Sequence, residues 1–181
     1  MSLRHIVSGG QTGVDRGALD AALAAGVSCG GWCPAGRRAE DGSVPLRYPM
    51  RETASSGYAE RTGRNVADSD GTLVLMFGIP AGGTALTAQC CKRLQRPLLL
   101  IDAASMSAAK AAEQAARFIC ERALNVLNVA GPRESEAPGA HRYASATVAT
   151  LLELCQTDSR REPVSADNVS NGAEHVVPRH R

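Results

Sequence analysis

A glycine-rich turn near the start of the chain, Ser8-Gly-Gly-Gln-Thr-Gly13, combines residue types suited to binding an anion. It follows a short apolar run and precedes a segment, residues 14–20, whose apolar spacing is helical. Glycines in such a turn leave backbone N–H groups available, and the positive end of the helix dipole lies behind them. The side chains between the glycines add further donors. The residues predicted to bind a phosphate-like anion are Gly9, Gly10, Gln11, Thr12 and Gly13.

Two further turns are predicted to lie beside the first. Gly82, Gly83 and Thr84 follow a continuous apolar run and offer close backbone approach and a hydroxyl donor at a helix start. The turn 131–133 follows another apolar run and supplies the guanidinium of Arg133. If these runs are parallel strands, all three turns leave carboxyl ends and meet at one edge of a sheet. The simpler alternative is that the glycines only relieve strain and that the threonine is an ordinary helix N-cap.

Arginines gather in the long irregular segment 33–57 and in the helix expected after it. They are Arg37, Arg38, Arg47, Arg51, Arg61 and Arg64. A guanidinium can bind phosphate through two parallel hydrogen bonds, so arginines beside an anion site predict a clamp. The alternative is a solvated charged surface. We expect Arg37, Arg38 and Arg133 to neutralise the bound anion.

Carboxylates and one thiol near these turns could supply chemistry. Asp15 follows the first turn, where it could accept hydrogen bonds from a ligand or simply complement the helix dipole. Glu40 and Asp41 could pair with arginines or act as acid–base groups, so Asp15 and Glu40 are the candidate catalytic residues. Cys33 is either a site residue or a buried structural thiol. No histidine has a partner at metal-ligand spacing, and no metal site is predicted.

The elements that would position these residues alternate between strand and helix. Strands are expected at 5–7, 27–32, 71–77, 97–101 and 126–130, and helices at 14–25, 58–68, 85–94, 106–123 and 141–155. This pattern predicts an α/β fold: a single doubly wound, Rossmann-like parallel sheet of about five strands with helices on both faces. Residues 1–156 are expected to form this ligand-binding domain, and the polar residues 157–181 a flexible tail.

Composition restricts the classes of function. The 181 residues suit one domain, and 44% hydrophobic with 21% charged residues is typical of a soluble globular protein. Only 3% are aromatic and the net charge is +2, so no nucleic-acid partner is expected. The sequence shows no signal peptide and no apolar run near the ~20 residues of a membrane span. We therefore expect a cytoplasmic protein without a membrane partner.

Several motifs of the chain occur together in one known family. They are Ser8–Arg16, Gly31–Gly42, Arg51–Thr53, Ser56–Arg61, Gly82–Thr84 and Asn128–Ser135. Over residues 3–155 the chain resembles the molybdenum-cofactor carrier family, which is Rossmann-like and related to the lysine-decarboxylase-like cytokinin-activating enzymes. The resemblance implies a homo-oligomer, dimer or tetramer, that binds the phosphorylated pterin of the molybdenum cofactor and delivers it to molybdoenzymes.

The related enzymes provide a contrast. They cleave nucleoside monophosphates between base and ribose and carry a P-G-G-x-G-T-x-x-E turn whose Glu is catalytic. Thr87 stands at that position here, and a hydroxyl cannot replace a carboxylate in activating water. Binding is therefore favoured over catalysis. The alternatives are a hydrolase acting on a nucleoside monophosphate or nucleotide sugar, with Asp15 or Glu40 as its acid–base group, and a nucleotide-sensing module.

Overall fold

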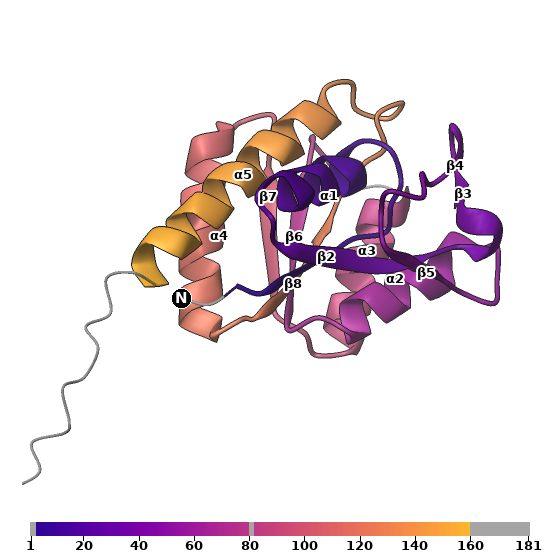
Figure 1. Ribbon diagram of the computed structural model, residues 1–181, viewed down its shortest axis with the longest axis horizontal. Helices are drawn as coiled ribbons and strands as arrows, with labels where there is room; N and C mark the ends of the chain where they lie inside the picture. The colour runs from indigo at the N-terminus through magenta and orange to yellow at the C-terminus, as the bar shows by residue number, and fades with distance from the viewer. Residues whose placement is uncertain (1–2, 80–81, 160–181) are drawn as a thin grey trace, which may run out of the picture.

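Six of the strands form one parallel sheet (Figure 1). The computed structural model describes residues 3–79 and 82–159, and within them six strands pair in the order β5-β2-β1-β8-β6-β7, every pair parallel. These strands are β1 (His5–Val7), β2 (Ser28–Cys33), β5 (Met50–Glu52), β6 (Gly71–Met76), β7 (Leu98–Asp102) and β8 (Val126–Ala130). The predicted doubly wound fold is confirmed, with one strand more than expected.

Helices cover both faces of the sheet. They are α1 (Val14–Ala24), α2 (Tyr58–Ala67), α3 (Gly82–Arg93), α4 (Ala108–Arg122) and α5 (Ala140–Ser159). Helix α5 packs against α1 and α4 on one face, and α2 packs against α3 on the other (Figure 1). Within these described ranges, no helix has the length and apolar character needed to cross a bilayer.

The strand order reverses near the middle of the sheet. From β1 the chain moves outward to β2 and β5, crosses to β6 and β7, and returns to β8 between β1 and β6. Right-handed crossovers in opposite directions place their helices on opposite faces, which produces the two helical layers. Ligands of such sheets bind beyond the carboxyl ends of the strands at the reversal, and the turns after β1, β6 and β8 all leave this edge.

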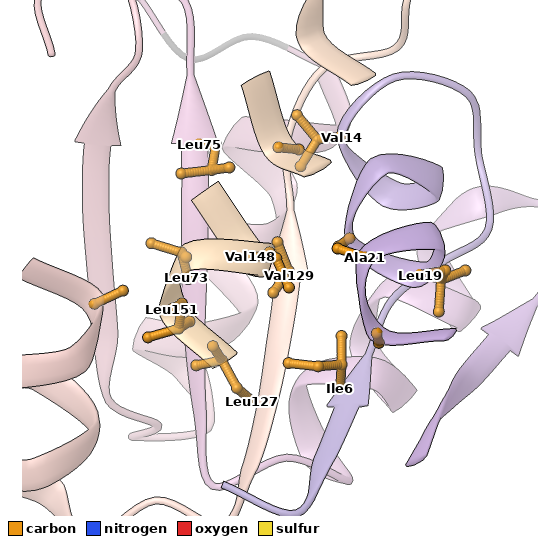
Figure 2. Close-up of a cluster of buried hydrophobic side chains, with 14 of the residues drawn as sticks. Ile6, Val14, Leu19, Ala21, Leu73, Leu75, Leu127, Val129, Val148 and Leu151 are labelled. Carbon is orange, nitrogen blue, oxygen red and sulfur yellow. The ribbon is translucent and has the colours of Figure 1, made fainter. Parts of the chain in front are cut away.

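The main core lies between the sheet and the layer containing α1 and α5 (Figure 2). Strands β1, β6 and β8 contribute side chains that meet those of the two helices. The labelled members are Ile6, Val14, Leu19, Ala21, Leu73, Leu75, Leu127, Val129, Val148 and Leu151. Central strands covered on both faces are continuous apolar runs, which is why the bounds of β6 and β8 could be predicted within one residue.

Segment 33–57 is more ordered than the predicted irregular loop. It contains a 3-10 turn at Ala35–Arg37, a small hairpin of β3 (Arg38–Ala39) and β4 (Gly42–Ser43), and the edge strand β5. Strand β5 extends the sheet by pairing with β2. Its three residues carry two charges and no apolar alternation, so neither length nor periodicity indicated a strand.

Two helix ends differ from the prediction by more than two residues. Helix α3 begins at Gly82 rather than at residue 85, because glycines with low helix propensity were assigned to the preceding turn. Helix α5 continues to Ser159, beyond the expected end of the domain at residue 156. The remainder of the predicted flexible tail, residues 160–181, lies outside the described residues.

Candidate ligand-binding site

A cavity of about 160 Å³ lies at the carboxyl edge of the sheet, beside the N-terminal ends of α2 and α3. Six residues predicted for the site line it: Gln11, Asp15, Gly82, Gly83, Thr84 and Arg133. The three turns after β1, β6 and β8 therefore meet, as parallel strand topology requires. A second cavity of about 220 Å³ adjoins the first and shares Gly82, Thr84 and Glu136 with it.

The second turn leaves the start of α3 open to this cavity. A Cβ atom added to Gly82 or Gly83 would meet no atom of the other described residues within 4 Å, the neighbouring backbone of the helix aside. The first N–H groups of a helix have no partner inside the helix, and they form the positive end of its dipole. Both properties suit a phosphate group at the start of α3.

The first turn, in contrast, is satisfied largely by the protein's own acceptors. The N–H groups of Gln11, Thr12 and Val14 donate to the Asp15 carboxylate (3.2 Å), to Gln11 Oε1 (3.0 Å) and to a backbone carbonyl after β8 (3.2 Å). Gly13 has φ +72°, and a Cβ there would lie 2.5 Å from the carbonyl oxygen of Pro132. This glycine lets the first turn pack directly against the third.

Asp15 and Arg61 form a buried ion pair beside the cavity. Arg61 Nη1 donates to Asp15 Oδ2 at 3.0 Å, and the two side chains are 14% and 3% exposed. A Cβ on Gly9 would lie 1.4 Å from that nitrogen, so the glycine provides the space for the guanidinium. Burial raises the pKa of the Asp15 carboxyl above its ordinary value, although Arg61 and the N–H of Gln11 act in the opposite direction.

Two buried donors in the cavity wall lack a hydrogen-bond partner within the described part of the chain. They are Gln11 Nε2 and Arg61 Nε. Buried polar atoms in native proteins are almost always paired, and an unpaired one costs about 1–3 kcal/mol. A ligand acceptor in the cavity would satisfy these donors.

Three arginines surround the ring of Tyr58, which lines the cavity; Arg61 and Arg133 also line it, and Arg38 does not. The guanidinium carbons of Arg133, Arg38 and Arg61 lie 4.9, 5.6 and 5.9 Å from the centre of its ring. Arg133 Nε is 4.0 Å from the carboxylate of Glu136, the limit of an ion pair. The three cations give this region of the surface a local positive charge that favours an anionic ligand.

The structure does not bring Arg37 to the cavity. Its guanidinium donates to the carbonyls of Val44 (2.9 Å), Pro45 (2.9 Å) and Tyr48 (3.0 Å), and so holds the loop before β5. Three other arginines of the predicted clamp pair with surface carboxylates: Arg47 with Asp20, Arg51 with Asp68 and Arg64 with Glu60. Only part of the arginine cluster in the sequence is therefore placed to meet a ligand.

The remaining candidate groups have structural contacts. The Glu40 carboxylate accepts hydrogen bonds from the hydroxyls of Thr12 and Ser135. Desolvation raises the pKa of Glu40, but these hydrogen bonds outweigh it and the pKa lies below its ordinary value. Asp41 forms a bidentate pair with Arg16.

Cys33 is fully buried, and burial raises the pKa of its thiol. This environment matches a structural thiol rather than a reactive one. Among residues 3–79 and 82–159, no group of three His, Cys, Asp or Glu side chains could hold a metal ion.

Sequence reasoning assigned no role to Tyr58 or Glu136, and it placed Arg61 only among the general arginine cluster. Tyr58 and Arg61 stand three residues apart at the start of α2, so they share one face of the helix. This spacing could have indicated that both side chains face the ligand, because a helix that follows an anion-binding loop presents its first turn to the ligand.

Comparison with known proteins identifies the family. The model of the family described as "Circularly permutated YpsA SLOG family" matches residues 6–152 of the chain. A crystal structure from Syntrophus aciditrophicus SB, named "Putative molybdenum carrier protein", is 40% identical with a TM-score of 0.81, covering 83% of this chain and 96% of its own. No curated protein matches the chain. The structural relative agrees with the predicted resemblance, and the chain belongs to the circularly permutated YpsA SLOG family.

Proposed function

We propose that the protein binds the molybdenum cofactor, a phosphorylated pterin, in the cavity at the start of α3 and carries it without transforming it. The observation that carries this proposal is the open N-terminal end of α3 beside buried, unpaired donors of Gln11 and Arg61. The name of the structural relative from Syntrophus supports a molybdenum carrier at the level of the family.

The residues of the cavity fit such a ligand. The start of α3 and the guanidinium of Arg133 would bind the phosphate through charge-assisted hydrogen bonds. Gln11 and the Asp15–Arg61 pair would bind the polar edge of the pterin ring, which carries both donors and acceptors. In this proposal the protein recognises the phosphate and the ring, and the molybdenum is cargo held by the pterin.

The contacts of the candidate acid–base groups favour carrying over cleavage. Thr87, at the position of the catalytic Glu in the related enzymes, donates its hydroxyl to the carbonyl of Gly83 at 2.9 Å. Asp15 is paired with Arg61, and Glu40 is bound by two hydroxyls. The alternative, a nucleoside monophosphate hydrolase, rests on the raised pKa of Asp15, since catalytic acids are tuned in this way.

Purification from a host that makes the cofactor tests the proposal. Mass spectrometry and absorbance of the wild-type protein should show a pterin close to one per chain. Gly83→Asp, which places a carboxylate at the open start of α3, should purify without the pterin. Ala109→Asp, which adds the same charge in the exposed first turn of α4 and outside the cavity lining, is the matched control, and it should retain the ligand. Absence of pterin from the wild type, together with turnover of a nucleoside monophosphate, would replace the carrier by the hydrolase.

A further inference from the structure

We propose that Gln11 recognises its ligand only as a hydrogen-bond donor. The site then selects a heterocycle with a ring carbonyl and rejects the same ring with an amino group in that place. This inference rests on the proposed function for the location of the ligand, and it adds a rule for which ring the site accepts. It follows from contacts of the Gln11 amide that leave it one possible orientation.

The orientation of the amide is fixed by two backbone groups. Gln11 Oε1 accepts the N–H of Thr12 at 3.0 Å and the N–H of Glu40 at 2.9 Å. Backbone N–H groups can only donate. A reversed amide would place its NH₂ group against both of them and lose both hydrogen bonds, so the oxygen must occupy this position.

The nitrogen of the same amide is left for a ligand. Gln11 is 4% exposed and lines the cavity, and its Nε2 is buried without a partner among the described residues. Because the oxygen is already engaged, the amide can offer a ligand only N–H donors. An acceptor on the ligand would pair with Nε2 and remove the free-energy cost of a buried donor without a partner. A donor on the ligand would leave both that donor and Nε2 without a partner.

The hairpin of β3 and β4 maintains this arrangement. Glu40 lies at its tip, and its carboxylate accepts hydrogen bonds from the hydroxyls of Thr12 and Ser135. These bonds hold the backbone N–H of Glu40 against Gln11 Oε1. The neighbouring Asp41 is fixed by its bidentate pair with Arg16. Glu40, offered above as an acid–base candidate, is thus a positioning residue for Gln11.

The adjacent carboxylate completes the chemical pattern. Asp15 lines the same cavity and contributes acceptor oxygens beside the donor of Gln11. A ring carbonyl next to a ring N–H, as in the 2-amino-4-oxopyrimidine edge of pterins and of guanine, complements this donor and acceptor. A ring with an amino group in place of the carbonyl, such as adenine or a 2,4-diaminopteridine, complements this pair only if the ring turns over, and an anionic group bound at the start of α3 opposes that rotation.

Matched ligand pairs test the inference on the purified full-length chain by calorimetric titration. The first pair is pterin-6-carboxylate and 2,4-diaminopteridine-6-carboxylate, and the second is GMP and AMP. In each pair the members differ at the atom assigned to Gln11; the pteridines differ there alone, whereas GMP also carries a 2-amino group that AMP lacks. The wild type should bind the oxo member about tenfold to a hundredfold more tightly than the amino member, the range expected when a buried donor is left unpaired.

Variants of Gln11 make the test specific. Gln11→Glu keeps an oxygen for the two backbone N–H groups and turns an acceptor to the ligand, so the preference should disappear or reverse. If circular dichroism shows that this variant does not fold, Gln11→Met removes the donor without adding charge and should abolish the preference. Gln114→Glu makes the matched change on α4, outside the cavity lining, and should keep the wild-type ratio.

The outcomes separate this inference from the proposed function. Equal binding of oxo and amino pteridines by the wild type overturns the donor role of Gln11 and leaves a pterin carrier standing. A preference for GMP over AMP without pteridine binding supports the donor role and overturns the pterin as ligand. If none of the four compounds binds, the donor role of Gln11 is overturned, and the pterin carrier is decided by the purification experiment above.

Discussion

The first and second glycine turns have similar sequences and opposite environments. Both follow a central parallel strand and begin a helix, and both contain neighbouring glycines and a threonine. The first turn directs its N–H groups to acceptors of the protein and packs Gly13 against Pro132. The second turn leaves open space beside Gly82 and Gly83.

This difference shows that glycine content alone does not identify an anion site. A glycine is needed both where another backbone must approach and where a ligand must approach. In the first turn, Asp15 and Gln11 supply negative charge and a carbonyl oxygen, which take the donors that an external anion would otherwise use. In the second turn, a Cβ built on either glycine would contact none of the described residues outside the helix within 4 Å.

The largest effect is expected from adding a methyl group to each turn. Gly13→Ala should lower the free energy of unfolding by about 2–4 kcal/mol, because the new Cβ would lie 2.5 Å from the Pro132 oxygen at a backbone conformation that only glycine adopts easily. Gly83→Ala should change it by less than about 0.5 kcal/mol, since the space is open. Urea unfolding of both variants measures the difference. Equal losses would show that the two turns are packed alike.

A negative charge at the second turn should affect binding more than folding. Gly83→Asp is expected to weaken binding of a phosphorylated pterin by about 2–3 kcal/mol, the worth of a hydrogen bond to a charged group plus repulsion. The free energy of unfolding should stay the same or rise by about 0.3–1 kcal/mol, because a carboxylate at a helix start is favourable. Calorimetric titration and urea unfolding of the same preparation check both statements. Unaltered affinity would remove the start of α3 from the site.

The sequence predicted the central part of the fold and less of its periphery. Strands β6 and β8 were evident because burial on both faces requires continuous apolar runs, and their parallel pairing implied that Gly82–Thr84 and Arg133 would meet. Strand β5 was missed because its pairing with β2 is not encoded in an apolar pattern. The contacts of Arg37 and the amide orientation of Gln11 depend on backbone groups distant in sequence, so residue types alone could not reveal them.

Two arginines near the turns are expected to have different roles, one in binding the ligand and the other in stabilising the fold. Arg133→Gln should weaken binding of the phosphorylated pterin by about 1.5–3 kcal/mol and change unfolding little, because its guanidinium has only a partly exposed contact with the Tyr58 ring and a 4.0 Å contact with Glu136. Arg37→Gln should do the reverse, since it removes the donors that hold the loop 44–50. Paired titration and thermal unfolding of the two variants distinguish these roles. Loss of affinity in Arg37→Gln with a stable fold would mean that Arg37 reaches the ligand.

The smallest expected effect is the contribution of Asp15, next to the first turn, to the pH dependence of the unfolding free energy. Burial raises the pKa of its folded state above the ordinary value of 3.8, so on raising the pH the unfolded chain releases this proton before the folded chain does. Stability from this group is complete below that value and is lost as the pH rises through the folded pKa. Asp15→Asn should therefore reduce the fall in unfolding free energy above about pH 4. Urea unfolding over a pH series measures the slope, and an identical slope in the variant would assign the titration elsewhere.

The central claim, that the second turn and not the first binds the anion, is tested most directly by backbone amide NMR. Inorganic phosphate is titrated into the ¹⁵N-labelled wild-type chain, and the amide shifts of the two turns are followed. We predict the largest shifts at Gly82, Gly83 and Thr84, with Gln11 and Thr12 changing little because their N–H groups already donate inside the protein. Largest shifts in the first turn, with none at the start of α3, would contradict the account.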